Sequence, residues 1–457
     1  MLLLMSGAPA LPAPAAPEFT PNYFDGDGDG LDDRLAPLVA RGEAVDIFLV
    51  FDVAPGSEQR RALGALGLAS SYESHYLPVW QLDDVPAHKL GWLTALPSLK
   101  LVEWQAIYYP LLSTSVPAVK ARDSSTYDDV AWDRGLQGAG VNIAILDTGV
   151  DNEHETFEGR FIAGVDCVGG CNAYTTEEDS GGDPDDRNGH GTHTASTALG
   201  TGGETDDDSD GEPDYMGVAP EARLVDVKVM TDLGAGGNVL QGIEWCADHA
   251  DEDWGSGTAG IQVMSMSVGT SGGSDGSDSV SQAANAAVAA GIVAVAAMGN
   301  DGDNVVPAPA AGDWVIAVGA TDDQDTVDRD GDPVASYSNY GPRQSDGDDD
   351  RWDEMKPDVV APGSGIRAAA GAPAPFTIAT DGYTTMDGTS MACPHVAGLA
   401  ALMLQDDPGL EPGSSQNEVM WRMRNFSEPW GAASEPDNSS KYNYYSGWGY
   451  VDAWEFV

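Results

Sequence analysis

The sequence predicts an α/β protein, in which a mostly parallel, doubly wound sheet follows a small α+β domain. The main observation is a series of short runs of Val, Ile and Ala that alternate with segments of helical periodicity. Continuous apolar runs of this kind are typical of parallel strands that helices cover on both faces. The expected strands begin near Val141, Arg223, Ile261, Gly291 and Trp314.

The second observation is a different pattern in residues 45–109. It consists, in order, of strand-like VDIFLVFDV from Val45, a helical segment from Glu58, strand material at 76–83, a helix from Ala87 and the strand-like LKLVEW from Leu99. This order predicts a ferredoxin-like β-α-β-β-α-β unit.

Changes in composition divide the chain into four segments. They are a leader and linker at 1–44, the small domain at 45–109, a Pro-containing linker at 110–123 and the large domain at 124–457. The first residues, MLLLMSGAPALPAPAAPEF, resemble the end of a secretion signal, so we expect a secreted protein. No run of 18 apolar residues occurs, and we therefore expect no membrane span.

The charge of the chain excludes one class of function. Its 74 acidic and 21 basic residues give a formal net charge of −53. Binding to a phosphate backbone requires Lys and Arg, so we expect no nucleic-acid partner. Two explanations of the acidity remain open and are compatible with each other: a surface that stays hydrated in high salt, or a set of divalent-cation sites.

The four cysteines are too few for a disulfide scaffold. Cys167 and Cys171, in CVGGC, are close enough in sequence to form a bridge across the Gly-Gly turn, but short loops often strain disulfide geometry. Whether they are bridged stays open. Cys246 lies in an apolar helical stretch and is expected to be a buried free thiol.

Four polar residues in distinctive motifs are candidates for catalysis. Asp147 (ILDTG) and Asn300 (AMGN) each follow an apolar run, at the carboxyl end where functional groups of parallel sheets lie. His190 opens HGTH, and Ser390 lies in the first turn of an expected helix in GTSMACPHVAG. Taken singly, three of them also have a structural explanation. Asp147 could serve a strand-to-loop turn, His190 could simply lie at a helix start, and Ser390 could be a helix N-cap. The order Asp, His, Ser matches one known arrangement of a catalytic triad.

The motifs ILDTGV, HGTH, MSMSVG, AAMGN and GTSMACPHVAG together resemble those of the subtilisin-like serine proteases (subtilases, peptidase family S8). GVAP, VIAVGAT, KPDVVAPG and GWGYVDA extend the resemblance over about 124–456. It implies a subtilisin-like fold with Ser390 as nucleophile, His190 as general base and Asp147 as the group that orients His190. The Asn300 side chain and the Ser390 backbone N–H would form the oxyanion hole, while His193 would be a packing residue.

The resemblance also implies how substrates bind. A peptide would add as a strand beside Ser267, Val268 and Gly269 and beside Leu233 and Gly234. Ala297, Met298 and Gly299 would form the other wall of the specificity pocket, with Met298 narrowing it. The walls carry no charge, so we expect broad specificity with a preference for apolar or aromatic side chains. Residues 45–109 resemble the family's inhibitory propeptide, so we expect a self-processing zymogen, cut between Ala106 and Asp123, that is otherwise a monomer.

Two acidic motifs of the form D-x-D-x-D-G-x-x-D are candidates for structural calcium. They comprise Asp25, Asp27, Asp29 and Asp33, and Asp206, Asp208, Asp210 and Asp214. Alternate carboxylates with a Gly turn form the first half of a calcium loop, although the glutamate expected at loop position 12 is absent. The second motif falls where subtilases carry a calcium loop. The acidic runs at 328–332 and 346–350 are expected to be solvated loops.

Three alternatives to a secreted calcium-stabilised endopeptidase are retained. A calcium-binding surface protein with an inactive protease fold would have no need to keep all three triad residues and Asn300. A sedolisin-type enzyme would carry an Asp in place of Asn300 and would lack HGTH. A peptidase that releases short peptides would use the same triad, and the sequence does not separate it from an endopeptidase.

Overall fold

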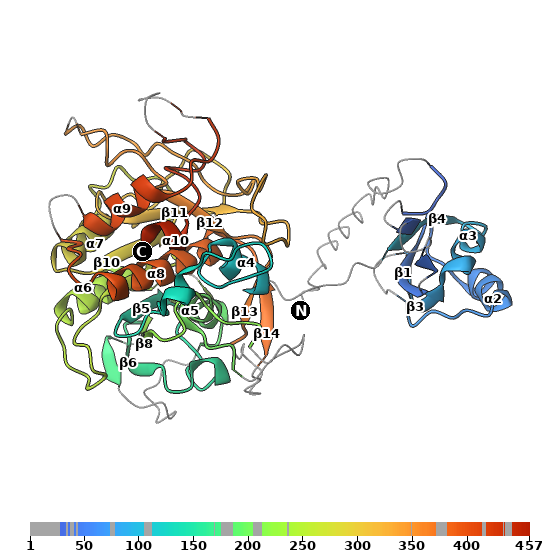
Figure 1. The fold of residues 1–457 in the computed structure, drawn as a ribbon, viewed down its shortest axis with the longest axis horizontal. Helices are drawn as coiled ribbons and strands as arrows, with labels where there is room; N and C mark the ends of the chain where they lie inside the picture. The colour runs from blue at the N-terminus through green and yellow to red at the C-terminus, as the bar shows by residue number, and fades with distance from the viewer. Residues whose placement is uncertain are drawn as a thin grey trace, which may run out of the picture. The chain divides into compact units, whose positions relative to one another are not determined.

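The computed structural model describes residues 28–32, 35–36, 41–42, 44–73, 78–104, 112–168, 170–174, 186–203, 213–234, 237–348, 350–371, 382–413, 417–432, 434 and 441–457. These residues form two compact units, one up to Tyr108 and one from Tyr109, which are described separately (Figure 1). None of the described helices is long and apolar enough to cross a membrane.

The first unit is an antiparallel sheet with the strand order β2-β3-β1-β4. Its elements are β1 (Ala44–Phe51), α2 (Ser57–Ala65), β2 (Tyr72–Glu73), β3 (Val79–Pro86), the short 3₁₀ helix η1 (Ala87–Lys89), α3 (Leu90–Leu93) and β4 (Leu99–Trp104). Ile47, Leu49 and Leu82 are fully buried in its core. The element order is the one that the sequence predicts.

The second unit is built on an eight-stranded sheet with the order β12-β11-β10-β9-β5-β8-β6-β7. All neighbours pair in parallel except β6 and β7. The strands are β5 (Asn142–Asp147), β6 (Phe161–Asp166), β7 (Asn172–Tyr174), β8 (Arg223–Lys228), β9 (Val263–Met266), β10 (Val293–Ala297), β11 (Ile316–Thr321) and β12 (Val359–Pro362). The expected doubly wound α/β fold is confirmed.

Helices cover both faces of this sheet (Figure 1). The helices are α4 (Leu112–Ala118), α5 (His190–Leu199), α6 (Val239–Asp248), α7 (Ser279–Ala289), α8 (Thr389–Asp406), α9 (Glu418–Phe426) and α10 (Ala453–Phe456), with the 3₁₀ helices η2 (Ala131–Arg134) and η3 (Glu155–Phe157). α5 and α8 contribute to one core cluster and α6 and α7 to the other. A separate hairpin pairs β13 (Ile366–Ala369) with β14 (Tyr383–Met386).

The central helix α8 is buried along most of its length. It packs on β9, β10, β11 and β12 and crosses α5. Gly398 lies at this crossing, where a Cβ atom would approach Val218 Cβ to 2.6 Å and the Ala198 carbonyl to 2.9 Å. Glycine is therefore required for the close approach of α8 to its neighbours, and this approach fixes where α8 begins.

The predicted linker at 110–123 differs from the structure from residue 112 onward. The chain forms α4 from Leu112, and Val116, Ala118 and Val119 are fully buried in the core of the second unit. Ser115 Oγ lies 3.0 Å from Nε2 of His395 on α8. The apolar side chains of this segment drive it into the core, so these residues belong to the large domain.

The cysteine pair is bridged. Cys167 and Cys171 form a disulfide across the short turn that joins β6 to β7, which answers the question that the sequence left open. Cys246 is buried and free, as predicted, and Cys393 on α8 is also a buried free thiol. Burial raises the pKa of the Cys393 thiol to about 11.

A buried ionic cluster joins β12 to α9. Asp358 is fully buried and accepts a hydrogen bond from Arg424 Nε at 2.6 Å and one from Lys356 Nζ at 3.1 Å. It also accepts from the Ala317 backbone N–H at 2.7 Å. Burial alone would raise the pKa of Asp358, but Arg424 and Lys356 hold it below its ordinary value.

Removing this carboxylate should strongly destabilise the second unit. In Asp358→Asn the two buried cations lose their counter-charge, and a broken buried ion pair typically costs about 3–5 kcal/mol. Urea unfolding measures the change, with exposed Asp406→Asn on α8 as the control, for which we expect less than about 0.5 kcal/mol. Equal stabilities of the two variants would contradict the assigned role of Asp358.

Candidate active site

The candidate catalytic residues gather at one edge of the parallel sheet. Asp147 is the last residue of β5, Ser267 directly follows β9, and Asn300 lies three residues after β10. His190 and Ser390 lie in the first turns of α5 and α8, which pack against each other. Because the carboxyl ends of parallel strands meet at one edge, residues separated by more than 200 positions come to a common site.

Asp147 and His190 are directly hydrogen-bonded. His190 Nδ1 lies 2.7 Å from Asp147 Oδ1, and Asp147 is fully buried whereas a quarter of the His190 side chain is exposed. The Thr148 backbone N–H also donates to Oδ1, and the Thr194 hydroxyl donates to Oδ2 at 3.3 Å. A carboxylate in this position holds the imidazole with its Nε2 directed away from Asp147.

Glycine at the second position of HGTH permits the close packing of α5 on the loop after β5. A Cβ atom on Gly191 would lie 2.0 Å from the Gly149 carbonyl oxygen and 3.1 Å from the Cβ of Asp147. A side chain there would push His190 away from Asp147. Packing therefore requires the glycine of the HGTH motif.

Asp186 is a second buried carboxylate beside the pair, and sequence analysis did not single it out. It is 2% exposed. Oδ1 accepts hydrogen bonds from the Thr148 hydroxyl at 2.8 Å and the Gly189 N–H at 2.9 Å, while Oδ2 accepts from the N–H and the hydroxyl of Thr192 at 2.9 and 2.7 Å. Asp186 thus ties the start of α5 to the residue after Asp147. A single aspartate in an acidic loop carries no such signal in the sequence.

Two carboxylates determine the protonation of His190. Burial lowers its pKa, but the charge and hydrogen bond of Asp147 and the charge of Asp186 outweigh burial, so the net shift is upward from 6.5. The two fully buried histidines on α5 and α8, His193 and His395, shift in the opposite direction. Burial lowers the pKa of His193 to about 3 and of His395 to about 4, so both are neutral packing residues.

Ser390 lies in the first turn of α8, where the positive end of the helix dipole and its own backbone N–H are close to the hydroxyl. The Ser390 hydroxyl donates to the Ser267 carbonyl at 3.4 Å, and the Ser267 hydroxyl donates to the Ser390 carbonyl at 2.7 Å. Among the described residues, no hydrogen bond joins Ser390 to His190. Such contacts are often long before substrate binds.

Asn300 is held by the residue next to Ser390. Its Oδ1 accepts hydrogen bonds from the Thr389 backbone N–H at 2.8 Å and from the Thr389 hydroxyl at 3.0 Å. With the amide oxygen engaged by Thr389, the Nδ2 group is the part of the side chain left to donate to a ligand. The side chain amide of Asn300 and the Ser390 N–H are the two donors expected of an oxyanion hole.

A cavity of about 210 Å³ adjoins Ser390 and Asn300. Five of the eight predicted substrate-binding residues line it: Ser267, Val268, Gly269, Ala297 and Gly299. Asp301, Pro307 and Asn339 also line it and were not predicted. Addition of a Cβ atom to Gly299 would bring it within 2.6 Å of Asn339 Nδ2, so glycine keeps this wall open.

Three predicted substrate residues do not line this cavity. Met298 is fully buried and packs with Ala294 and Ala296 in the core on the opposite face from Ala297, so it does not narrow the pocket. The alternation of side chains along β10 explains this error. Leu233 is 89% exposed, and Gly234 lies near the Asn188 side chain, on the loop before His190.

The predicted calcium ligands lie largely outside the described residues. Of the eight aspartates, only Asp29 and Asp214 are described, and Asp214 is 4% exposed. The described residues do contain one compact acidic group, formed by Asp313, Asp346 and Asp353. Its centre is taken by Arg343, whose guanidinium nitrogens lie 2.6–3.3 Å from the three carboxylates. The three carboxylates therefore already share a positive charge from the protein itself.

Comparison with known proteins identifies the family. The family model "Subtilase family" matches residues 138–449. This chain belongs to the subtilase family. It is a subtilisin-like serine protease, 35% identical over 338 residues to serine protease AprX of Bacillus subtilis, a match that covers 70% of this chain and 67% of AprX.

Two further relatives and one solved structure support the same family. Subtilisin-like protease 1 of Arthroderma gypseum is 36% identical over 64% of this subtilase and 47% of its own length, so the chain spans about half of that relative. The thermophilic serine proteinase of a Bacillus species is 35% identical over 56% of its length. Among solved structures, sphericase matches with a TM-score of 0.55 and 31% identity over 74% of this chain and 97% of its own.

The pH dependence of activity tests the two carboxylates. The expected role of His190 as general base requires the neutral imidazole, so peptidase activity should rise with pH through a pKa above 6.5. Asp186→Asn removes one of the charges that raise this pKa, and the acid limb of the kcat/KM profile should move to lower pH. Exposed Asp251→Asn should leave the limb in place. An unmoved limb in Asp186→Asn would show that its charge does not reach His190.

The raised pKa of His190 also makes the stability of the fold depend on pH: stability should fall as the pH rises, whereas activity should increase. The folded-state pKa of His190 lies above the unfolded value, so its protonated form stabilises the fold below about pH 6.5. This contribution is lost as the pH rises through the folded pKa. Comparison of unfolding free energies with those of His190→Gln on either side of that interval measures it.

Proposed function

We propose that this subtilase is a secreted, calcium-stabilised endopeptidase that is made as a self-processing zymogen and acts through Asp147, His190 and Ser390. The contact that carries the proposal is the 2.7 Å hydrogen bond between Asp147 and Nδ1 of His190. Nδ1–H donates to the carboxylate, which leaves Nε2 as the base. The shared edge of the sheet with Ser390 supports the same assignment.

In the proposed mechanism, the Ser390 hydroxyl attacks the carbonyl carbon of the scissile bond as His190 Nε2 takes its proton. Negative charge then forms on the carbonyl oxygen, and the Asn300 amide and the Ser390 N–H donate to it. The bond to nitrogen breaks as His190 protonates the leaving amine. Water, activated in the same way, hydrolyses the acyl-enzyme and restores Ser390. Asp147 stabilises the imidazolium in both halves.

Variants of Ser390 and Asn300 should lose activity to different extents. Ser390→Ala should abolish peptidase activity and accumulate as the uncut precursor. Asn300→Ala removes one oxyanion donor and should lower kcat by about 10²–10³-fold. Asn304→Ala, on the same loop but hydrogen-bonded to the Tyr340 and Pro342 carbonyls, is the matched control and should retain activity. Processing that persists in Ser390→Ala would contradict self-processing.

The specificity proposal rests on the wall of the 210 Å³ cavity. Val268, Ala297 and Pro307 make it apolar, while the charge of Asp301 lies at an exposed position. Peptide substrates with Phe before the scissile bond should have a higher kcat/KM than those with Lys. A preference for Lys would mean that Asp301 governs the pocket, and Asp301→Asn would then reverse it.

We further propose that the first unit is the inhibitory propeptide. Because α4 packs in the core of the second unit, we restrict the proposed cleavage to residues 105–111. The freed unit would inhibit until it is degraded. Mass spectrometry of the mature enzyme locates the new N-terminus, and an N-terminus after Leu112 would contradict this proposal.

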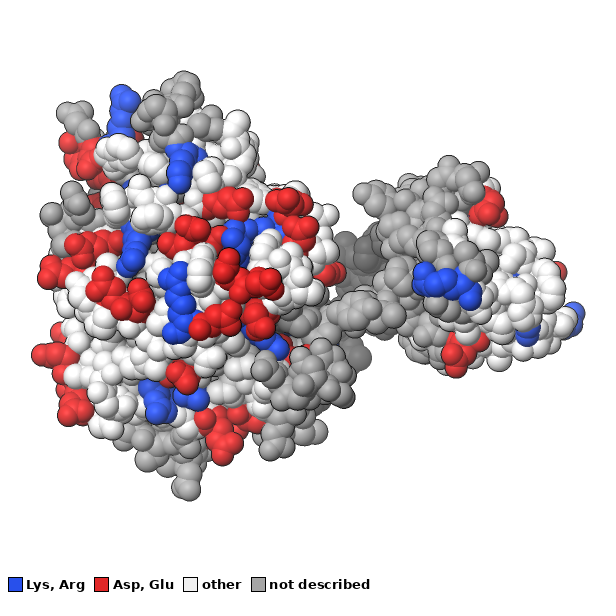
Figure 2. Space-filling view, in the orientation of Figure 1, with Lys and Arg blue, Asp and Glu red and all other residues white. Residues whose placement is uncertain are grey.

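Calcium is proposed to bind the loop that contains Asp206, Asp208, Asp210 and Asp214. Support comes from the alternate carboxylates of the motif, of which Asp214 is 4% exposed. Chelation should lower the midpoint of thermal unfolding of the second unit, and added calcium should restore it at constant ionic strength. Restoration by sodium chloride alone would instead assign the acidic residues to salt adaptation. Figure 2 shows acidic residues spread over the visible face of this unit, which makes the salt control necessary.

A further inference from the structure

A second cavity, of about 470 Å³, lies away from Ser390. Trp314 precedes β11, Asp353 precedes β12, and α9 supplies Trp421 and Arg424. β11 and β12 are parallel, so this cavity adjoins the amino ends of strands, whereas the candidate catalytic residues follow carboxyl ends. The two sites therefore lie at opposite edges of the sheet.

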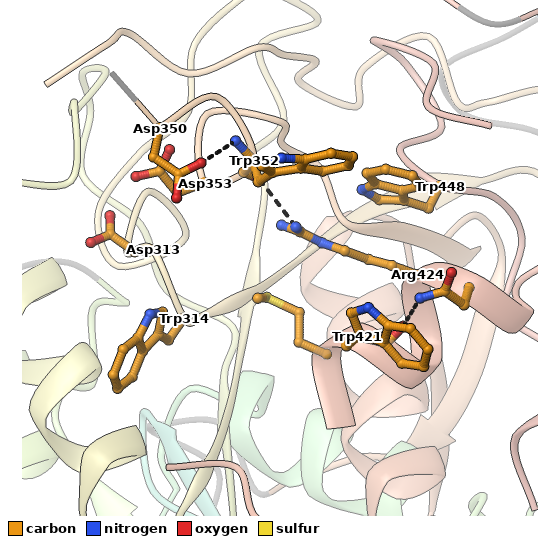
Figure 3. Close-up of a pocket in the computed structure, with 10 residues that line it drawn as sticks. Asp313, Trp314, Asp350, Trp352, Asp353, Trp421, Arg424 and Trp448 are labelled. Carbon is orange, nitrogen blue, oxygen red and sulfur yellow. Dashed lines mark hydrogen bonds between the residues drawn. The ribbon is translucent and has the colours of Figure 1, made fainter. Parts of the chain in front are cut away.

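Four tryptophans surround this cavity: Trp314, Trp352, Trp421 and Trp448 (Figure 3). Trp352 and Trp421 are 55% and 53% exposed, which is high for such large apolar side chains. The Trp352 and Trp448 rings stack with their centroids 5.7 Å apart, and the Arg424 guanidinium lies 5.7 Å from the Trp448 ring. The protein itself thus makes one cation–π contact in this cavity.

Carboxylates line the other side of the same cavity. Figure 3 shows Asp313, Asp350 and Asp353 together on one side of the hollow, with Trp421 and Trp448 on the other. Arg343 pairs with Asp313 and Asp353 but leaves Oδ1 of Asp353 without a hydrogen bond among the described residues, although Asp353 is only 8% exposed. Burial raises the pKa of Asp353 to about 6 against the opposing effect of Arg343.

The arrangement excludes several classes of ligand. A divalent metal would compete with Arg343, which already occupies the centre of the acidic group. The carboxylates that line the cavity would repel an anion. Arg424 repels a cation only weakly, because Asp358 neutralises it with a hydrogen bond of 2.6 Å. Arg343 leaves Oδ1 of Asp353 without a hydrogen bond among the described residues, and Asp350 is exposed. Flat aromatic faces beside such carboxylates are the combination that recognises ammonium groups carrying alkyl substituents.

We propose that this cavity is a binding site for a small organic cation, with the exposed Trp421 and Trp352 faces contacting its alkyl groups and Asp350 supplying charge. The cation is a substituted ammonium group. It can come from a free solute such as a quaternary ammonium compound, or from a methylated lysine side chain of a protein. Both sources present the same chemistry to the cavity.

A pair of probes that differ only in charge tests the proposal. Choline is compared with 3,3-dimethylbutan-1-ol, its neutral isostere, by saturation-transfer NMR and calorimetry on the full chain. Loss of the cation–π and carboxylate interactions should weaken binding of the neutral probe by about 3- to 30-fold. No binding of choline, or equal binding of both probes, overturns the proposal.

Two exposed positions allow variants that should fold normally. Trp421→Leu and Asp350→Asn should each weaken choline binding several-fold while peptidase activity stays unchanged. The matched controls are Phe426→Leu, exposed on the same helix but outside this cavity, and exposed Asp330→Asn; both should bind choline like the unaltered chain. If the controls and the cavity variants lose affinity equally, the binding lies elsewhere and the proposal fails.

A second set of probes distinguishes the two sources. The N-acetyl methylamide of trimethyllysine is compared with choline and with the corresponding unmethylated lysine derivative. Tighter binding of the trimethyllysine derivative than of choline assigns the site to a protein side chain. Tighter binding of choline assigns it to a free solute. Tightest binding of unmethylated lysine would overturn the requirement for alkyl substituents.

Discussion

The packing of α8 across the parallel sheet is the constraint on which the rest of the second unit depends. Its apolar residues lie in the main core beside strands β9 to β12, and Gly398 lets it approach α5 closely. Once this helix is seated, its first turn must lie at the carboxyl edge of the sheet. Ser390, the proposed nucleophile, is thus positioned by a helix that is held along its length, and Thr389 extends this order to Asn300 through two hydrogen bonds.

Sequence analysis predicted those parts of the protein whose residues lie beside a recognisable motif or apolar run. Asp147 and Asn300 follow apolar strands, and parallel pairing brings them to one edge. Ser390 opens an apolar helix, whose packing on the sheet brings it to the same edge. Asp186 could not be found in this way, because its partners at Thr148 and Thr192 become its neighbours only when the loops fold. The four-tryptophan cavity was missed for the same reason, since its walls come from segments separated by more than 100 residues.

The errors have equally specific causes. Met298 was grouped with Ala297 and Gly299 because the three are consecutive, yet alternation along β10 turns it to the opposite face. The linker was predicted to extend to residue 123 because the segment contains prolines. Its apolar residues are buried in the core of the second unit, and they determine how the segment packs. The sequence predicted least about the acidic residues, because it does not show which of them form buried ion pairs. Asp353 pairs with an arginine and Asp358 with two cations, while others lie in exposed loops, and the acidic composition of the chain does not distinguish them.

The helix α4 has a consequence for the proposed maturation by cleavage between the two units. Its buried face and the contact between Ser115 and His395 make it an internal part of the protease core, although it lies next to the first unit in sequence. A cut just before it would separate the two units while leaving every buried contact of this helix intact. Maturation would then alter the connectivity of the chain and leave the architecture of the core unchanged. The precursor and the mature enzyme would differ in what can reach the active site, with the catalytic framework already complete in both.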